Sequence, residues 1–91
     1  MLQSTTDVKI INRRGLHARA SAKFVRMAEN LDADILVSKD GVEVCGTSIM
    51  GLMLLAAAQG DTITITAKGQ NCEDALQSLV HLIGDRFEED H

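Results

Sequence analysis

The hydrophobic period of this 91-residue chain switches several times between two and about 3.6, and this switching constrains its fold most. Asp61–Ala67 alternates threonine with isoleucine, which is typical of a strand with one buried face. Ala18–Asn30 spaces its small and apolar residues three and four apart, which predicts a helix. From Asn71 to Phe87 apolar residues again recur at helical spacing, so we expect a last helix there.

The other strands are shorter and are marked by their turns. Alternation over Val8–Asn12 predicts a first strand that ends near Arg13-Arg14-Gly15. Asp34–Lys39 and Val42–Gly46 flank Asp40-Gly41, a dipeptide that tolerates the positive φ angles of a tight hairpin. These two segments should therefore pair antiparallel.

A short helix should follow the hairpin, because Thr47 and Ser48 can each cap the apolar stretch that comes next and Gln59-Gly60 ends it. The expected order is β-α-β-β-α-β-α, which belongs to the α+β class. We predict an open-faced two-layer α/β sandwich, with three helices on one face of a four-stranded, mainly antiparallel sheet. Residues 1–91 should form a single domain.

Composition excludes several classes of function. The chain is 45% hydrophobic and 24% charged, as folded proteins are, and no apolar run reaches the ~20 residues of a membrane helix. Its start shows no secretory signal, so we expect a cytoplasmic protein that does not bind membranes. Two phenylalanines and a net charge of −4 argue against nucleic acid. Cys45 and Cys72 have no metal-type spacing, so we expect two reduced, mostly buried thiols, no metal and no cofactor.

Charge is unevenly distributed along the chain. Val8–Ala28 contains six of the nine basic residues and no acidic residue. The six are Lys9, Arg13, Arg14, Arg19, Lys23 and Arg26. This clustering predicts a site that attracts an anion or an acidic partner, although a solvated helix face remains the alternative.

His17 lies where the first helix should begin. The leading N–H groups of a helix lack internal acceptors, and they form a site for a phosphate group. These positive dipoles, with Arg14 and Arg19 close by, disfavour the imidazolium, so we expect a neutral, nucleophilic ring. Gly15 allows the sharp turn ahead of the site. A plain helix cap or surface histidine is the alternative, and His81 on the polar side of the last helix illustrates it.

Two segments carry a resemblance to a known family. Gly15-Leu16-His17-Ala18-Arg19-Ala20-Ser21-Ala22 resembles the motif G-[LIM]-H-A-R-P-A of HPr, the histidine-containing phosphocarrier of bacterial phosphotransferase systems. Ser48-Ile49-Met50-Gly51-Leu52-Met53 resembles the regulatory-serine segment of the same family. The resemblance covers essentially the whole chain, and it implies the same sandwich fold.

The resemblance implies a phosphoryl relay that is not an independent enzyme. His17 would accept phosphate through Nδ1 from phosphorylated enzyme I and donate it to an enzyme IIA domain. Arg19 matches the arginine that contacts the phosphoryl group. Gly15 and Ala18 would support the phosphate at the same site. Ala20 departs from the family, which usually has proline there, and this should cost rigidity but no chemical group.

Ser48 matches the serine that HPr kinase/phosphorylase modifies in some lineages. A phosphate on a helix cap is locally favourable, so a regulatory binding module switched by phosphorylation of Ser48 is the alternative function. Simple capping of the short helix remains possible. A third alternative, a small-molecule binding domain, would need a closed apolar pocket that the sequence does not indicate.

A partner surface should surround the histidine. Ile49, Met50 and Met53 resemble the apolar docking patch of the family, and Leu52 and Leu55 should be buried beneath it. With the patch we group four residues of the first helix besides Arg19, namely Ala18, Ala22, Lys23 and Arg26. We expect a monomer. The acidic tail Arg86-Phe87-Glu88-Glu89-Asp90 resembles that of the nitrogen-related regulatory carriers of the family. We therefore favour the regulatory branch over the sugar-uptake branch.

Overall fold

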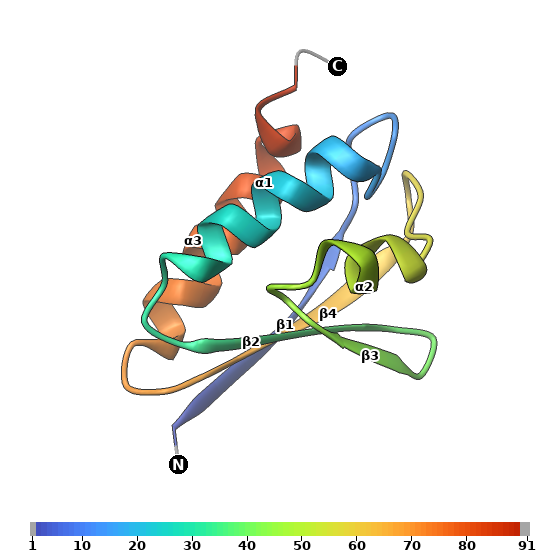
Figure 1. Ribbon diagram of the computed structural model, residues 1–91. Helices are drawn as coiled ribbons and strands as arrows, with labels where there is room; N and C mark the ends of the chain where they lie inside the picture. The colour runs from blue at the N-terminus through green and yellow to red at the C-terminus, as the bar shows by residue number, and fades with distance from the viewer. Residues whose placement is uncertain (1, 90–91) are drawn as a thin grey trace.

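The structure is a computed structural model that describes residues 2–89. Its strands are β1 (Gln3–Lys9), β2 (Asp34–Lys39), β3 (Val42–Cys45) and β4 (Thr62–Lys68). They form one antiparallel sheet in the order β1-β4-β2-β3. The sheet therefore places the first and last strands of the chain side by side, as Figure 1 shows.

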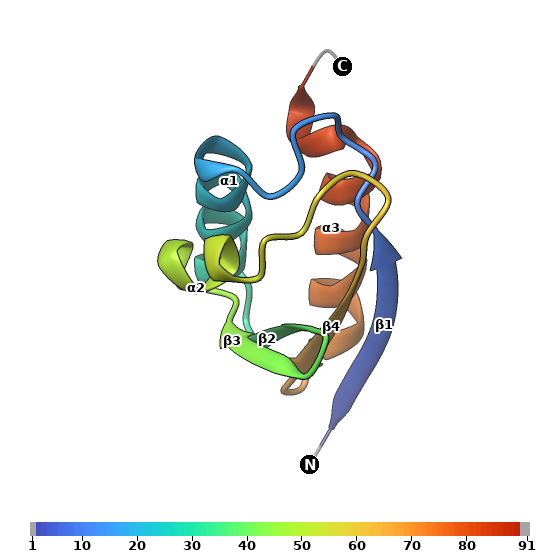
Figure 2. The same ribbon diagram turned by 90° about the vertical axis from the view of Figure 1, so that its right-hand side faces the viewer.

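Three helices cover one face of this sheet, which confirms the predicted open-faced sandwich (Figure 2). They are α1 (Ala18–Glu29), α2 (Ile49–Leu54) and α3 (Cys72–Gly84), and a short 3-10 turn, η1 (Arg86–Glu88), follows α3. The helices bury one side of each inner strand. The largest fully buried apolar side chains are Phe24, Phe87, Ile10, Leu52, Ile63, Ile65, Leu79, Ile83 and Val37.

The hairpin and β4 follow the expected physics closely. Asp40 and Gly41 have φ of 51° and 84°, and they join β2 to β3 in a tight turn. On β4, Ile63 and Ile65 are buried, whereas the intervening threonines face the open side of the sheet. There Thr64 donates a hydrogen bond of 2.7 Å to Asp7 of β1. Polar pairs thus hold together the sheet face that no helix covers.

The first strand differs from the prediction. It spans Gln3–Lys9, so it begins and ends earlier than the expected strand near Val8–Asn12. Its inward positions are largely polar and only half-buried, so the segment lacks a local hydrophobic signal. Ile10 continues the pairing with backbone bonds to Asp61 and Gly60 of 2.8 and 2.7 Å. The chain then turns away toward α1.

The helices also depart from the prediction in detail. The buried side of α1 is Ala20, Ser21, Phe24, Val25 and Ala28, and it includes the polar Ser21, which the predicted spacing of small and apolar residues did not single out. α2 ends at Leu54, well before Gln59-Gly60. α3 ends at Gly84, and Phe87 belongs to η1, where it is still fully buried.

One of the two cysteines differs from the prediction. Cys72 is buried but Cys45 is exposed, so the prediction of two mostly buried thiols was wrong for Cys45. His81 is exposed on α3, as expected. Within residues 2–89, no helix combines the length and apolar character needed to cross a membrane. The same residues hold no group of three or more His, Cys, Asp or Glu side chains that could bind a metal ion.

Candidate functional site

The connection between β1 and α1 is fixed by a glycine turn. Gly15 has φ of 64°, and a Cβ there would collide with the carbonyl oxygen of Ala57. Next to it, the N–H of Leu16 donates to that same oxygen at 2.9 Å. The turn therefore presses against the segment after α2 and sets the position at which α1 begins.

His17 is the N-cap residue of α1. Its backbone is extended, with φ of −75° and ψ of −178°, and its ring Nδ1 accepts a hydrogen bond of 3.2 Å from the N–H of Arg19. The side chain is 16% exposed, so it is held in place yet reaches solvent. The ring thus lies at the positive end of the helix, as the sequence predicted.

The second ring nitrogen of His17 faces a residue from the far end of the chain. Nε2 lies 3.3 and 3.2 Å from the two carboxylate oxygens of Glu89. The buried Asn12 donates from Nδ2 to Glu89 at 2.9 Å and to the carbonyl of Gly15 at 2.8 Å. Asn12 thus ties the histidine loop to the chain end, and its Oδ1 has no hydrogen-bond partner among the described residues.

These contacts assign different roles to the two ring nitrogens. Nδ1 accepts a backbone N–H, so it carries a lone pair, and Nε2 carries the proton that a carboxylate can accept. A neutral ring in this tautomer presents its nucleophilic nitrogen to the end of α1. The arrangement suits attack on an electrophile that the helix amides also attract.

Basic residues around the site differ in their availability. Arg13, Arg14, Arg19 and Arg26 are exposed. Lys23 is engaged instead: its ammonium group donates to the carbonyl of Phe87 at 2.8 Å and lies 3.9 Å from Glu88. In this structure the ammonium group of Lys23 holds η1 in place. Its role in partner binding stays a prediction.

Ser48 caps α2. Its Oγ accepts a hydrogen bond of 2.9 Å from the N–H of Gly51, and its side chain is half-buried. Ser48 is therefore the cap, and Thr47, the other candidate, lies outside the helix and is exposed.

The apolar residues of α2 divide as expected between core and surface. Leu52 and Leu55 are buried, whereas Ile49, Met50 and Met53 are 40%, 72% and 42% exposed. α2 packs beside α1, on which Ala18 is exposed and Ala22 half-buried. Leu54, which the sequence analysis did not single out, is 75% exposed on the same helix.

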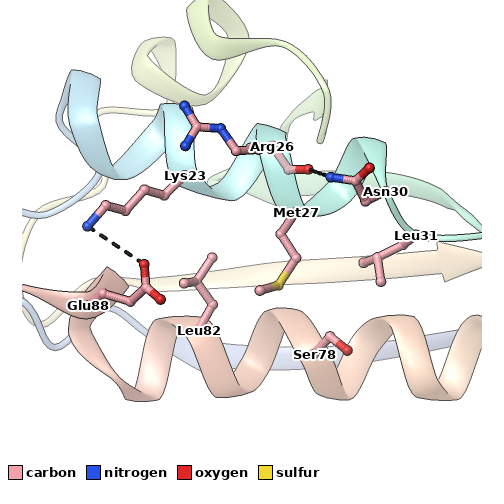
Figure 3. A pocket seen from close by; sticks show the side chains of 8 residues that line it. All are labelled: Lys23, Arg26, Met27, Asn30, Leu31, Ser78, Leu82 and Glu88. Atoms are coloured by element: carbon pink, nitrogen blue, oxygen red, sulfur yellow. Dashed lines mark hydrogen bonds and ion pairs between the residues drawn. The ribbon is translucent and has the colours of Figure 1, made fainter.

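An open groove runs between α1 and α3 (Figure 3). It has a volume of about 400 Å³ and is open to solvent rather than a closed pocket. Its lining residues are Lys23, Arg26, Met27, Asn30, Leu31, Ser78, Leu82 and Glu88. This groove is therefore not the closed apolar pocket that a small-molecule binding domain would need.

Sequence reasoning missed two residues of the site, Asn12 and Glu89. Asn12 was seen only as part of an alternating pattern, yet a polar residue in an inward position just before the histidine loop was a usable signal. Glu89 was considered only as part of the acidic tail, yet Glu88 and Glu89 contact Lys23 and His17 respectively. Asp90 and His91 of the predicted tail lie outside the described residues.

Known proteins place the chain in a family. The family profile described as "PTS HPr component phosphorylation site" matches residues 4–85. "Phosphocarrier protein HPr" of Cupriavidus necator is 45% identical over 91% of this chain and 93% of its own length. "Phosphocarrier protein NPr" of Shewanella violacea is 35% identical over 98% of both chains.

A solved structure agrees with these sequence relatives. The crystal structure of HPr-C-His from Thermoanaerobacter tengcongensis has a TM-score of 0.91 and 39% identity, and the match covers 97% of this chain and 99% of that one. Its agreement extends to the fold as a whole. With a profile that spans most of the sequence, these likenesses show that the chain belongs to the HPr family of phosphocarrier proteins.

Proposed function

We propose that the chain relays a phosphoryl group on Nδ1 of His17, from phosphorylated enzyme I to an enzyme IIA domain. The observation that carries this proposal is the placement of Nδ1 at the N-terminus of α1, where it accepts the N–H of Arg19. In this reading the protein is a substrate of its partners and not an independent enzyme.

The transfer step needs only the ring and the donor. The lone pair of Nδ1 attacks phosphorus while the bond between phosphorus and enzyme I breaks, and the electron pair of that bond stays with enzyme I. The Arg19 N–H then turns from the ring nitrogen to a phosphoryl oxygen. Donation to a IIA domain reverses the roles, with Nδ1 as the leaving group.

The helix end would stabilise the phosphoryl dianion without trapping it. Backbone N–H groups and the macrodipole contribute about 0.3–2 kcal/mol at such positions, which is too little to prevent onward transfer. Arg19 is exposed and would add a guanidinium beside the dianion. Within residues 2–89 it forms no ion pair in this state, so it is available for that contact.

Labelling with phosphoenolpyruvate and enzyme I tests the proposal. The chain should take up an acid-labile, base-stable phosphate, and His17→Ala should abolish the label. His81→Ala is the matched control, because His81 is exposed on α3 and should leave labelling intact. A wild-type chain that stays unlabelled would contradict the relay.

The acceptor side of the relay is part of the same proposal. The exposed residues Ile49, Met50 and Met53, with the positive charges of α1, would receive a partner with an acidic, partly apolar surface. We propose that the chain works as a monomer in the cytoplasm. To determine whether the chain belongs to the sugar-uptake or the nitrogen-related branch, the labelled chain is mixed with candidate IIA domains of both types from the same cell. The type that takes up the label identifies the branch.

Ser48 supports a second candidate function, as a regulatory switch. Its Oγ lies at the first turn of α2, so an added phosphate would stay near unpaired helix N–H groups and bring negative charge to the docking patch. HPr kinase with ATP should give an acid-stable label that Ser48→Ala removes. Thr47→Ala, the neighbouring hydroxyl variant, should retain it.

A further inference from the structure

Glu89 contacts the functional histidine on the side away from the nucleophilic nitrogen. Both carboxylate oxygens lie within 3.3 Å of Nε2, whereas Nδ1 faces the N–H of Arg19. The Glu89 side chain is only 13% exposed. Within residues 2–89, Glu89 is the charged group within ion-pair distance of the His17 ring.

The turn η1 (Arg86–Glu88) holds Glu89 in this place. Arg86, Phe87 and Glu88 have φ of 54°, 54° and 65°, a left-handed run that is costly for residues other than glycine. The buried ring of Phe87 anchors this turn in the core. Strain of this kind persists only where the surrounding contacts enforce it.

Further contacts from outside the tail fix the same turn. Lys23 of α1 donates to the carbonyl of Phe87 at 2.8 Å. Its ion pair with Glu88, drawn in Figure 3, spans 3.9 Å to a side chain that is 67% exposed, and surface pairs of this kind contribute little to holding the turn. Asn12 donates to the Glu89 carboxylate at 2.9 Å. The carboxylate is thereby oriented by a buried amide, and η1 lies beside the start of α1 (Figure 1).

We propose that Glu89 is a positioning residue for phosphoryl transfer: it holds the Nε2 proton of His17 and stabilises the ring when Nδ1 carries phosphate. The inference rests on the proposed relay at His17. It assigns to the chain end a role in the relay that the sequence motifs do not contain.

The chemistry requires no proton to leave the ring. When Nδ1 forms its bond to phosphorus, the bond from phosphorus to enzyme I breaks and its electron pair leaves with enzyme I. Nε2 keeps its proton, so the ring gains positive charge, and the carboxylate of Glu89 faces that charge. Onward transfer returns the pair to Nδ1 and restores the neutral ring.

Two variants of adjacent glutamates test the role. Glu89→Gln and Glu88→Gln each remove one negative charge, but only Glu89 touches His17. Glu89→Gln should lower the maximal rate of phosphoryl transfer from enzyme I about tenfold with little change in KM, because a charge-assisted bond is lost. Glu88→Gln should transfer at the wild-type rate.

A spectroscopic measurement separates positioning from a structural effect. In 15N NMR of the phosphorylated chain, the Nε2–H proton of His17 should exchange with solvent about tenfold faster in Glu89→Gln than in the wild type, because its charge-assisted hydrogen bond is lost, and at the wild-type rate in Glu88→Gln. Backbone shifts of Phe87 report whether the tail still docks in each variant.

The possible outcomes are distinct. Equal transfer rates and equal Nε2–H exchange rates in the two variants would overturn the inference. A faster transfer in Glu89→Gln would also overturn it, because Glu89 would then hinder the reaction. Failure of the relay itself would appear differently, as a wild-type chain that takes up no phosphate from enzyme I.

Discussion

Gly15 shows how one residue sets the position of the site. It lies two residues before His17 in a left-handed conformation, and its lack of a side chain lets the loop meet the carbonyl of Ala57. Any Cβ would push the loop outward and shift the start of α1. Because Nδ1 meets the Arg19 N–H over 3.2 Å, a small shift would break that contact.

Gly15→Ala should therefore lower the free energy of unfolding by about 1–3 kcal/mol, the cost of a strained backbone position. Urea denaturation measures the change. Gly84→Ala is the matched control, since a Cβ at Gly84 meets nothing within 4 Å and should stabilise α3 by about 0.5–1 kcal/mol. Equal effects of the two variants would contradict the role of Gly15.

Ser48→Ala should lower the free energy of unfolding by about 1 kcal/mol, because the Gly51 N–H loses its acceptor. Ser48→Asp should keep most of the stability, since a carboxylate also caps a helix. Thermal unfolding of both variants, with Thr47→Ala as the control, gives the answer. A Thr47→Ala variant as unstable as Ser48→Ala would show that the cap was misassigned.

At the residue scale, local patterns predicted the positions of His17 and Ser48, because each lies at the start of a helix that the neighbouring residues indicate. Asn12 and Glu89 could not be predicted in the same way. Their mutual contact joins residues 77 positions apart, and it depends on the turn of η1. Only the packed fold brings such residues together.

At the scale of elements, α1 carries the site on its first turn. His17 caps the helix, and the N–H of Ser21 donates to its carbonyl at 2.9 Å. Ala20 lies between them and is fully buried. It occupies the position at which the family usually has proline, inside the first turn, where no backbone hydrogen bond within the helix needs its N–H.

Ala20→Pro should raise the free energy of unfolding by about 0.4–1 kcal/mol, because proline restricts the unfolded chain and fits a first turn. Calorimetry measures the effect. Ala22→Pro, two residues later in α1, should lose about 3 kcal/mol because that N–H belongs to the helix ladder. A loss of stability in Ala20→Pro would show that the buried site has no room for the ring.

The success of sequence prediction varied between elements for physical reasons. The β2–β3 hairpin was predicted correctly because its turn residues and alternation are local. β1 was placed wrongly because its inward residues are largely polar and its partner, β4, lies far along the chain. The end of α3 was extended to Phe87 because periodicity cannot distinguish a helix from a turn that buries the same side chain.

At the scale of the whole molecule, α1 and α2 present the functional surface together. The two helices pack side by side (Figure 2). The first has the histidine at its start, and Met50 and Leu54 of the second are largely exposed. Exposed apolar residues surrounded by basic residues are typical of a surface that attracts acidic partners electrostatically and then binds them.

Met50→Ala should raise the KM for enzyme I about fivefold, the equivalent of about 1 kcal/mol of binding, with no loss of stability. Steady-state transfer kinetics measure this effect. Val42→Ala truncates another exposed apolar residue, at the β2–β3 hairpin, and is the control that should leave the KM unchanged. Matching kinetics for the two variants would place the docking surface elsewhere.

The site of phosphorylation is the central claim, and NMR of the labelled chain tests it most directly. With 15N-labelled histidine and phosphate supplied by enzyme I, coupling to phosphorus should appear at Nδ1 of His17 alone. Coupling at Nε2, or at His81, would contradict the assignment of Nδ1 as the nucleophile at the start of α1.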